Sequence, residues 1–346
     1  MKQNIISDNL NLEQKNFPSN VLLLGTHGTD KIPDFLRKEI RSDFSGRLVR
    51  NYSDIGTQII LAGVPEQQKA IPPYGRLSGD PARPKNAPDF IRSVDFNFNP
   101  IWKKSFHIKR LIAKIIPFSK YSTKNLARLS SKPYIKNIFA KLELLLKDNR
   151  NQNKPIYIID LHDTSNRLLG ATEDEDFLRE NATPVNIKQK FRKKFGRFFA
   201  KKVFSVLSPD VGWSMPQAIL SNASGKTCSK KTLSSLQKAL SQQFNIPSEK
   251  IELNTVFKGG YITKFFGGTH KNPRLKKLLQ KYNRPQQSLQ VVQLELNRGL
   301  YMNEKQQKLN KNIFSVRKNI LSAISPLRNV VLQTKEKINK IITEEE

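Results

Sequence analysis

Apolar residues along the chain gather into three segments that predict buried β-strands. Residues 21–24 (VLLL) and 156–159 (IYII) are short apolar runs, and each is followed within a few positions by polar residues. Residues 291–297 (VVQLELN) alternate between apolar and polar positions, and a period of two is typical of a strand whose two faces differ. Distant parts of the chain are therefore expected to meet in one sheet.

The third of these strands carries a carboxylate among apolar residues. Val292, Leu294 and Leu296 share one face, and Val291, Gln293, Glu295 and Asn297 share the other. Burying an unpaired carboxylate costs on the order of several kcal/mol. We therefore expect Glu295 to be neutral, paired, linked to a metal or facing a cavity.

Between the predicted strands, apolar residues recur at the spacing of a helix. This spacing predicts a helix that begins at Ser53 or Asp54, a helix capped near Ser229, and basic amphipathic helices within residues 101–150 and 186–202. Strands that alternate with helices favour an α/β domain with a mainly parallel or mixed sheet.

The 346 residues are enough for a sizeable core, and the simplest organisation is one domain. We expect this domain over residues 21–304, with residues 101–150 as a basic helical insertion. Residues 1–20 would form an N-terminal extension, and residues 305–346 a C-terminal helical tail interrupted near Pro326.

The charge of the chain changes this picture by adding candidate partners. Sixty Lys and Arg against 29 Asp and Glu give a net charge of +31. Such an excess attracts anionic membrane lipid, nucleic acid or acidic substrates, and it is also compatible with an ordinary solvated basic surface. The basic helices of residues 101–150 and 186–202 are the expected contact for lipid or nucleic acid, unless they only cover the core with one face.

Cysteine content and hydropathy bear on the compartment. Cys228 is the single cysteine, so no disulfide forms within the chain, which is compatible with a reducing cytosol. No apolar run reaches the roughly 18 to 20 residues of a membrane span, and the N-terminus lacks the apolar core of a secretory signal. We therefore expect a soluble, cytoplasmic protein; its oligomeric state is open.

Two of the four histidines, His27 and His162, stand where a predicted strand ends. One such histidine is usually a structural hydrogen-bonding group, but two at the ends of neighbouring strands can reach a common ion. Catalytic zinc takes three protein ligands, commonly two His and a carboxylate. Asp30 and Asp54 are the carboxylates nearby, and each is also a plausible turn or helix-cap residue.

Other polar residues lie near these strand ends. Asp160 shares a strand face with His162 and is expected to orient it. The Pro-rich loop RLSGDPAR contains Arg76, Asp80 and Arg83, and a guanidinium group there can bind a carboxylate in bidentate fashion.

The Gly-rich segment FKGGYIT is expected to be strand-like and contains Gly259, Gly260 and Tyr261. Its two glycines allow close approach of the backbone. The segment SGKT lacks the first glycine of a phosphate-binding loop, which argues against ATP binding.

Taken in order, the segments HGTDKIP, SDIGT, RLSGDPARP, PYIKNIFAKL, IIDLHD, NTVFKGGYITKFFG and VVQLELNRGLYMNE resemble the N-formylglutamate amidohydrolase family. The resemblance runs from about Val21 to Glu304. It implies a relative of the zinc carboxypeptidases, with a phosphorylase/hydrolase-like mixed sheet flanked by helices.

The resemblance also implies roles for the residues identified above. His27 and His162 become zinc ligands with Asp54 as the third, and Asp30 is the alternative to Asp54. Glu295 becomes the general base and acid. Arg83 and Arg76 would bind the substrate together with Gly259, Gly260 and Tyr261, while Asp160 and Asp80 would support the ligands.

The implied activity is zinc-dependent hydrolysis of the amide of a small N-acyl amino acid, such as N-formylglutamate. The sequence departs from the family pattern at Ala82 and Ile135 and in the basic residues 101–130, so the substrate itself stays open. The alternatives are a zinc peptidase or cell-wall amidase, and a lipid- or nucleic-acid-binding protein on a degenerate hydrolase scaffold.

Overall fold

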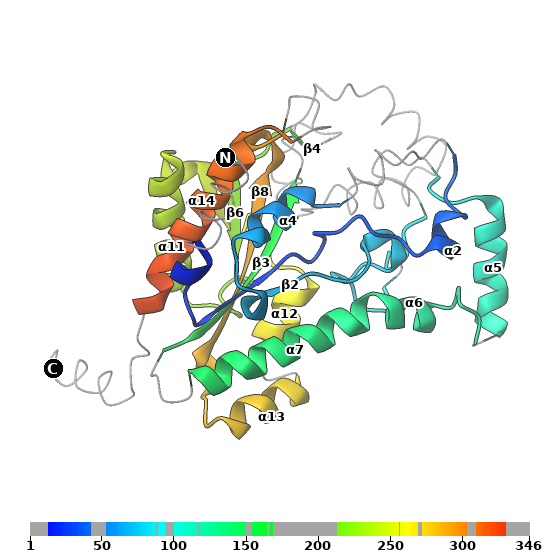
Figure 1. Ribbon diagram of the computed structural model, residues 1–346, viewed down its shortest axis with the longest axis horizontal. Coiled ribbons are helices and arrows are strands. Elements are labelled where there is room, and N and C mark those ends of the chain that lie inside the picture. The colour runs from blue at the N-terminus through cyan, green and yellow to red at the C-terminus, as the bar shows by residue number, and fades with distance from the viewer. Residues whose placement is uncertain are drawn as a thin grey trace, which may run out of the picture.

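A computed structural model gives the fold shown in Figure 1. It describes residues 13–42, 53–87, 89–93, 100–116, 118–149, 154–164, 167–168, 213–255, 257–268, 272–302 and 309–329. The strands are β1 (Val21–Leu24), β2 (Lys69–Ala70), β3 (Ile156–Thr164), β4 (Arg167–Leu168), β5 (Trp213–Ser214), β6 (Ala218–Ser221), β7 (Ile251–Leu253) and β8 (Leu289–Asn297). The helices are α2 (Asp34–Arg37), α4 (Ile55–Ala62), α5 (Lys104–Ile115), α6 (Thr123–Leu129), α7 (Ser131–Asp148), α11 (Lys230–Phe244), α12 (Tyr261–Gly267), α13 (Pro273–Lys281) and α14 (Asn312–Ile324).

Six strands form one mixed sheet in the order β2-β1-β3-β8-β6-β7. The first four are parallel to one another, while β6 pairs antiparallel with β8 and parallel with β7. The register places Leu24 beside Asp160, and Glu295 between His162 and Ile219. The predicted α/β fold with a mixed sheet is confirmed.

Helices cover both faces of this sheet (Figure 1). On one face Leu23, Ile159 and Leu294 pack with α4, α11 and α14 in a large apolar core. On the other face Leu24, Ile158 and Val291 pack with α7, α12 and α13. The alternation predicted for residues 291–297 is confirmed, because Val292, Leu294 and Leu296 all lie in the first core.

A third apolar core lies outside the sheet. It joins α2, the loop around Leu77 and Phe90, and helices α5 and α6. The predicted insertion, residues 101–150, thus has two environments. Its last helix, α7, is part of the wall of the sheet, whereas α5 and α6 belong to the separate third core.

Two segments differ from their predicted structure. Strand β3 continues to Thr164, because it pairs with β8 along its whole length, so His162 lies within the strand and not after it. The segment around Gly259 and Gly260 was expected to be strand-like, and it is a turn that leads into α12. Gly259 has a φ of +90°, which removes it from an extended conformation.

The C-terminal helix α14 packs against α4 and α11 within the first core, and a 3-10 turn over Ser325–Asn329 follows it, close to the predicted break at Pro326. The predicted basic helix over residues 186–202 lies outside the described residues. Among the helices that the structure describes, none is long and apolar enough to span a bilayer.

Candidate metal centre

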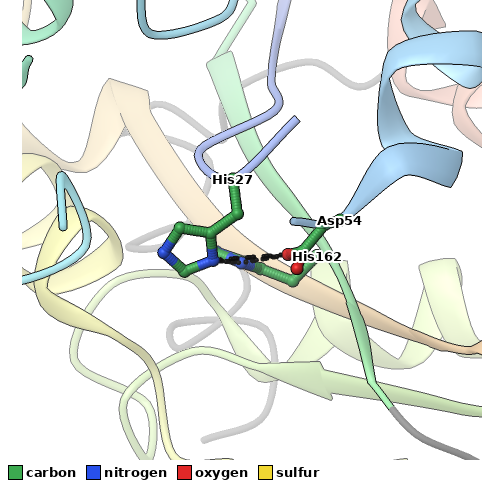
Figure 2. Close-up of side chains that lie close together, drawn as sticks. All are labelled: His27, Asp54 and His162. Atoms are coloured by element: carbon green, nitrogen blue, oxygen red, sulfur yellow. Dashed lines mark hydrogen bonds and ion pairs between the residues drawn. The ribbon is translucent and has the colours of Figure 1, made fainter. Parts of the chain in front are cut away.

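Three of the predicted residues meet at the carboxyl ends of the parallel strands. His27 lies in the loop after β1, Asp54 precedes the first residue of α4, and His162 lies near the end of β3 (Figure 2). The Nδ1 atoms of the two imidazoles are 3.2 Å apart. Oδ2 of Asp54 lies 3.3 Å from Nδ1 of His27 and 3.2 Å from Nδ1 of His162. All three side chains are buried.

This donor set fits a tetrahedral metal ion. Two imidazole nitrogens and a carboxylate oxygen are a common ligand set of catalytic zinc, with bonds of about 2.0–2.2 Å. In a regular tetrahedron, bonds of that length separate the ligand atoms by about 3.3–3.6 Å. The observed separations of 3.2, 3.3 and 3.2 Å agree closely with this spacing.

Carboxylates on the far side of each imidazole fix its orientation. Nε2 of His27 is 2.7 Å from Oδ1 of Asp80, and Nε2 of His162 is 3.1 Å from Oδ2 of Asp160. Since an ionised carboxylate only accepts hydrogen bonds, each Nε2 carries a proton. When the imidazoles are neutral, each Nδ1 therefore directs its lone pair towards the other and towards Asp54, so the arrangement favours positive charge between the three atoms.

Asp160 and Asp80 are themselves held in place. The hydroxyl of Thr26 donates to Oδ1 of Asp160, and Thr26 Oγ1 lies 2.9 Å from the hydroxyl of Tyr134 on α7. The backbone N–H of Ala82 donates to Oδ1 of Asp80 at 2.9 Å. The neighbouring helix and loop therefore determine how both imidazoles lie.

The other oxygen of Asp54 is occupied by arginine. Nη2 of Arg76 donates to Oδ1 at 2.6 Å, and Nη2 of Arg298 lies 3.7 Å from the same atom. The backbone N–H of Asp163 donates to Oδ2 at 3.3 Å. Oδ2 is thereby turned towards the histidines.

Arg298 is part of a buried network beside α4. Its Nε donates to Asp163, and its Nη2 donates to the carbonyl of Ser53 at 3.0 Å. The hydroxyl of Tyr301 donates to Oδ2 of Asp163 at 2.6 Å. This network joins the ends of β3 and β8 to the residues that precede α4.

Glu295 lies on β8 directly beside His162 in the register of the sheet. Its side chain is buried, and Oε1 accepts a hydrogen bond of 2.5 Å from Nε2 of Gln293. The amide oxygen of Gln293 accepts in turn from the backbone N–H of Gly260. Gln293 thus connects the carboxylate to the turn before α12.

Burial and neighbouring charges shift the pKa values at this centre in opposite directions. Burial, helped by the neighbouring charge of Asp54, raises the pKa of Glu295 to about 7, although His162 opposes the rise. Burial opposes charge on His162, but Asp160 and Asp54 dominate and raise its pKa.

For Asp54, burial alone would raise the pKa, but Arg76 and the two histidines hold it well below its usual value. The pKa of Asp80 is likewise lowered, because His27, Arg83 and Arg76 outweigh the effect of burial. Both carboxylates are therefore ionised at neutral pH, as metal ligation and its support require.

The remaining predicted residues lie around this group. Asp30 does not belong to the three-residue group within the described part of the chain. Arg83 is half-buried, and its Nε donates to Asp89 at 2.8 Å. Tyr261, at the start of α12, has its ring centroid 5.4 Å from that of Phe265, with the two rings tilted by 40°. Gly259 lies against the backbone of Ala223, where a side chain would be crowded.

Several residues that support the centre were not predicted from the sequence. They are Thr26, Tyr134, Asp163, Gln293, Arg298 and Tyr301. A signal was available for Gln293, since it shares a strand face with Glu295 at a separation of two residues. The others stand within or beside the quoted segments, but no spacing rule assigns them to this site.

The fold and the site define an α/β protein with a group of candidate metal ligands at the carboxyl ends of parallel strands, where such sheets commonly bind ligands. The family model for N-formylglutamate amidohydrolase matches residues 19–302. The chain therefore belongs to the N-formylglutamate amidohydrolase family, and this membership supports an amidohydrolase.

Two solved structures are similar to the chain, and the first of them supports the fold. The chain is similar to N-formylglutamate amidohydrolase from Ralstonia eutropha JMP134, with a TM-score of 0.51 and 14% identity over 90% of this chain and 93% of that chain. A gene product of Agrobacterium tumefaciens also matches, with a TM-score of 0.44 and 10% identity over 90% and 92%. No curated protein sequence matches the chain.

Proposed function

We propose that the protein is a zinc-dependent amidohydrolase that cleaves the amide of a small N-acyl amino acid. The observation that carries the proposal is the close approach of His27 Nδ1, His162 Nδ1 and Asp54 Oδ2, beside the buried carboxylate of Glu295. Family membership supports the reaction type. We choose zinc because two imidazoles and a carboxylate are a common ligand set of catalytic zinc.

A zinc ion held by these three residues would polarise the amide carbonyl and make water more acidic. Glu295 would take a proton from the attacking water and deliver it to the nitrogen of the leaving amine. A pKa near neutrality suits a group that must both accept and donate a proton at neutral pH. Gln293 would hold the carboxylate in position throughout.

The substrate would be recognised beside this carboxylate. For N-formylglutamate, water adds to the formyl carbon, the C–N bond breaks, and formate and glutamate are released. We assign the substrate carboxylate to the guanidinium of Arg83, which lies three residues from Asp80 in the same loop. Gly259, Gly260 and Tyr261 would shape the pocket, while Arg76 would act through its bond to Asp54.

A substrate panel combined with metal analysis tests the proposal. The purified protein should contain about one zinc per chain and release formate from N-formylglutamate or a close analogue. Glu295→Gln should retain the metal and lose at least about 100-fold in kcat, the usual contribution of a general acid–base group. Glu249→Gln, on the surface, is the matched control.

Two outcomes would contradict this function. One is a protein that binds no divalent metal and hydrolyses no amide; the other is a Glu295→Gln variant with unchanged kcat. Small peptides and muropeptide fragments belong in the same panel, because cleavage of these alone would assign a peptidase or cell-wall amidase. A cytoplasmic location, proposed from the single buried Cys228, is tested by fractionating cells.

A further inference from the structure

Helix α5 lies at the outer edge of the molecule, far from the sheet (Figure 1). It exposes a row of large apolar side chains. Among the described residues, eight large apolar side chains are exposed, and six of them lie between Ile108 and Phe118. We call these six the α5 outer face: Ile108, Leu111, Ile112, Ile115, Ile116 and Phe118. Single exposed apolar residues are ordinary, but a contiguous group of this kind marks a contact surface.

The spacing of this group is that of one helix face. Residues 108, 111, 112 and 115 follow the i, i+3, i+4, i+7 pattern, so their side chains lie in one stripe. Ile116 and Phe118 continue the stripe where the helix ends. Ile115 is 82% exposed and Phe118 is 89% exposed, so the stripe ends in two side chains that contact almost nothing.

The opposite side of α5 is firmly attached to the protein. Phe106 is buried and stacks on Trp102 with ring centroids 4.1 Å apart. Lys109 forms an ion pair with the buried Glu39, which also accepts hydrogen bonds from Ser105 at 2.8 Å and from Tyr121 at 3.2 Å. The α5 outer face is therefore held outward by packing on the other side of the same helix.

The charge around this face selects one kind of partner. Residues 101–142 contain eleven Lys and Arg and no Asp or Glu. Lys104, Lys114 and Lys120 are exposed along α5 and just beyond it. A second copy of the chain would bring these cations against their own equivalents, whereas an anionic lipid surface complements them.

We infer that the α5 outer face docks on an anionic bilayer surface. The helix would lie in the plane of the membrane, with its apolar stripe in the boundary between headgroups and acyl chains and its lysines among the headgroups. This inference does not rest on the proposed hydrolysis, because α5 and the candidate metal centre share no residue.

Vesicle flotation of the full-length protein tests the inference. The protein should float with vesicles of phosphatidylcholine and phosphatidylglycerol, and much less with phosphatidylcholine alone. Binding should weaken as salt is raised, because screening reduces the attraction of surface charges. Absence of binding to anionic vesicles at low salt would overturn the inference.

A double variant that removes two apolar side chains distinguishes binding through this surface from nonspecific binding. Ile115→Ser combined with Phe118→Ser should lower the vesicle partition coefficient at least about tenfold, since two large side chains no longer enter the bilayer boundary. The matched control is Leu144→Ser combined with Phe314→Ser, which removes two exposed apolar side chains elsewhere. Circular dichroism verifies that both proteins fold. Equal losses in the two proteins would contradict the assignment to α5.

A double variant with reversed charges tests whether lysines of α5 contact the lipid headgroups. Lys104→Glu with Lys114→Glu should reduce binding about tenfold or more, while Lys276→Glu with Lys277→Glu, the same change on α13, should reduce it much less. Phe118→Trp should give a blue-shifted emission only with anionic vesicles.

Two further results would assign the face to another partner and overturn the inference. The first is a concentration-dependent dimer, seen by ultracentrifugation, that Ile115→Ser combined with Phe118→Ser abolishes while vesicle binding stays unchanged. The second is a random DNA duplex that binds through Lys104 and Lys114 and fully displaces the vesicles, while the emission of Phe118→Trp stays unshifted.

Discussion

Neighbouring residues on β3 have separate tasks at the candidate metal centre. His162 offers Nδ1 to the three-atom group, while Asp163 points to the opposite face and binds Arg298 and Tyr301. The backbone N–H of Asp163 also donates to Asp54. One dipeptide thus contains one candidate metal ligand, His162, and supports another, Asp54.

The carboxylates behind the histidines should determine metal affinity. Asp160→Asn and Asp80→Asn each remove the charge that holds an imidazole proton on Nε2, so each should weaken zinc binding about 10- to 100-fold. Competition with a coloured chelator measures the dissociation constant. Asp34→Asn, an exposed change on α2, should leave it unchanged; unaltered affinity in both site variants would contradict the assigned orientation.

Glu295 should make the metal-free protein less stable as pH rises. Its pKa is raised from 4.5 to about 7 in the folded chain, so the folded state binds the proton more tightly. This stability is fully present below pH 4.5 and is lost as pH rises through about 7, and it amounts to about 3 kcal/mol. Urea unfolding at about pH 4.5 and pH 8 measures it, and Glu295→Gln should lose correspondingly less than the wild type over this interval.

Sequence alone predicted the residues whose chemistry is unusual for their position. A carboxylate in an apolar strand and histidines at strand ends are visible without a structure, and so is Asp160 two residues before His162. Arg298 and Tyr301 were not predicted, because their partner Asp163 is 135 and 138 residues away along the chain. Only the sheet register shows that they meet.

At the scale of elements, helix α4 is positioned by its first turn. Asp54 occupies the N-cap position without a side-chain bond to the helix, because its carboxylate is engaged by Arg76 and faces the histidines. Gly56, in the same turn, lies against the ring of Tyr301. The start of α4 is thus shaped by the site as much as by its own capping.

Gly56→Ala should disturb this contact. A methyl group there would overlap the Tyr301 ring, so the variant should lose about 1–3 kcal/mol of unfolding free energy and have reduced kcat. Denaturant unfolding and formate release measure the two effects. Gln58→Ala, an exposed change on the same helix, should be close to neutral; equal stability of both variants would contradict the packing described here.

Helices and strands were predicted best where the periodic pattern of apolar residues was long. The alternation of β8 and the cap of α11 at Ser229 agree with the structure. The end of β3 and the start of α12 were not predicted, since polar residues inside a paired strand and a glycine at positive φ depend on tertiary contacts. The alternatives Ser53 and Asp54 differed by one residue, and the structure places Asp54 at the cap.

For the whole molecule, the candidate metal centre joins segments that are far apart in sequence. The loop after β1, the start of α4 and the end of β3 converge on one point, between the two cores that flank the sheet. An ion at this point would link these segments in the folded state only. Its binding free energy would then add to the stability of the whole fold.

Removal of metal should therefore lower Tm. With free zinc about 1,000-fold above its dissociation constant, binding stabilises the folded state by about 4 kcal/mol, and a chelator should abolish this gain. His162→Ala should have a lower Tm that neither zinc nor chelator changes. His107→Ala, on the exposed side of α5, should respond like the wild type, and a zinc response that survives in His162→Ala would place the ion elsewhere.

The alternation along β3 also limits how this chain can change in length. Insertion or loss of one residue between Ile156 and Asp160 would exchange His162 and Asp163 between the faces of the sheet and remove the imidazole from its partners. Exchanges among aliphatic residues at Ile156 or Ile158 leave the faces unchanged. Related chains that retain the same chemistry should therefore vary β3 by substitution and place their insertions and deletions in the loops between strands.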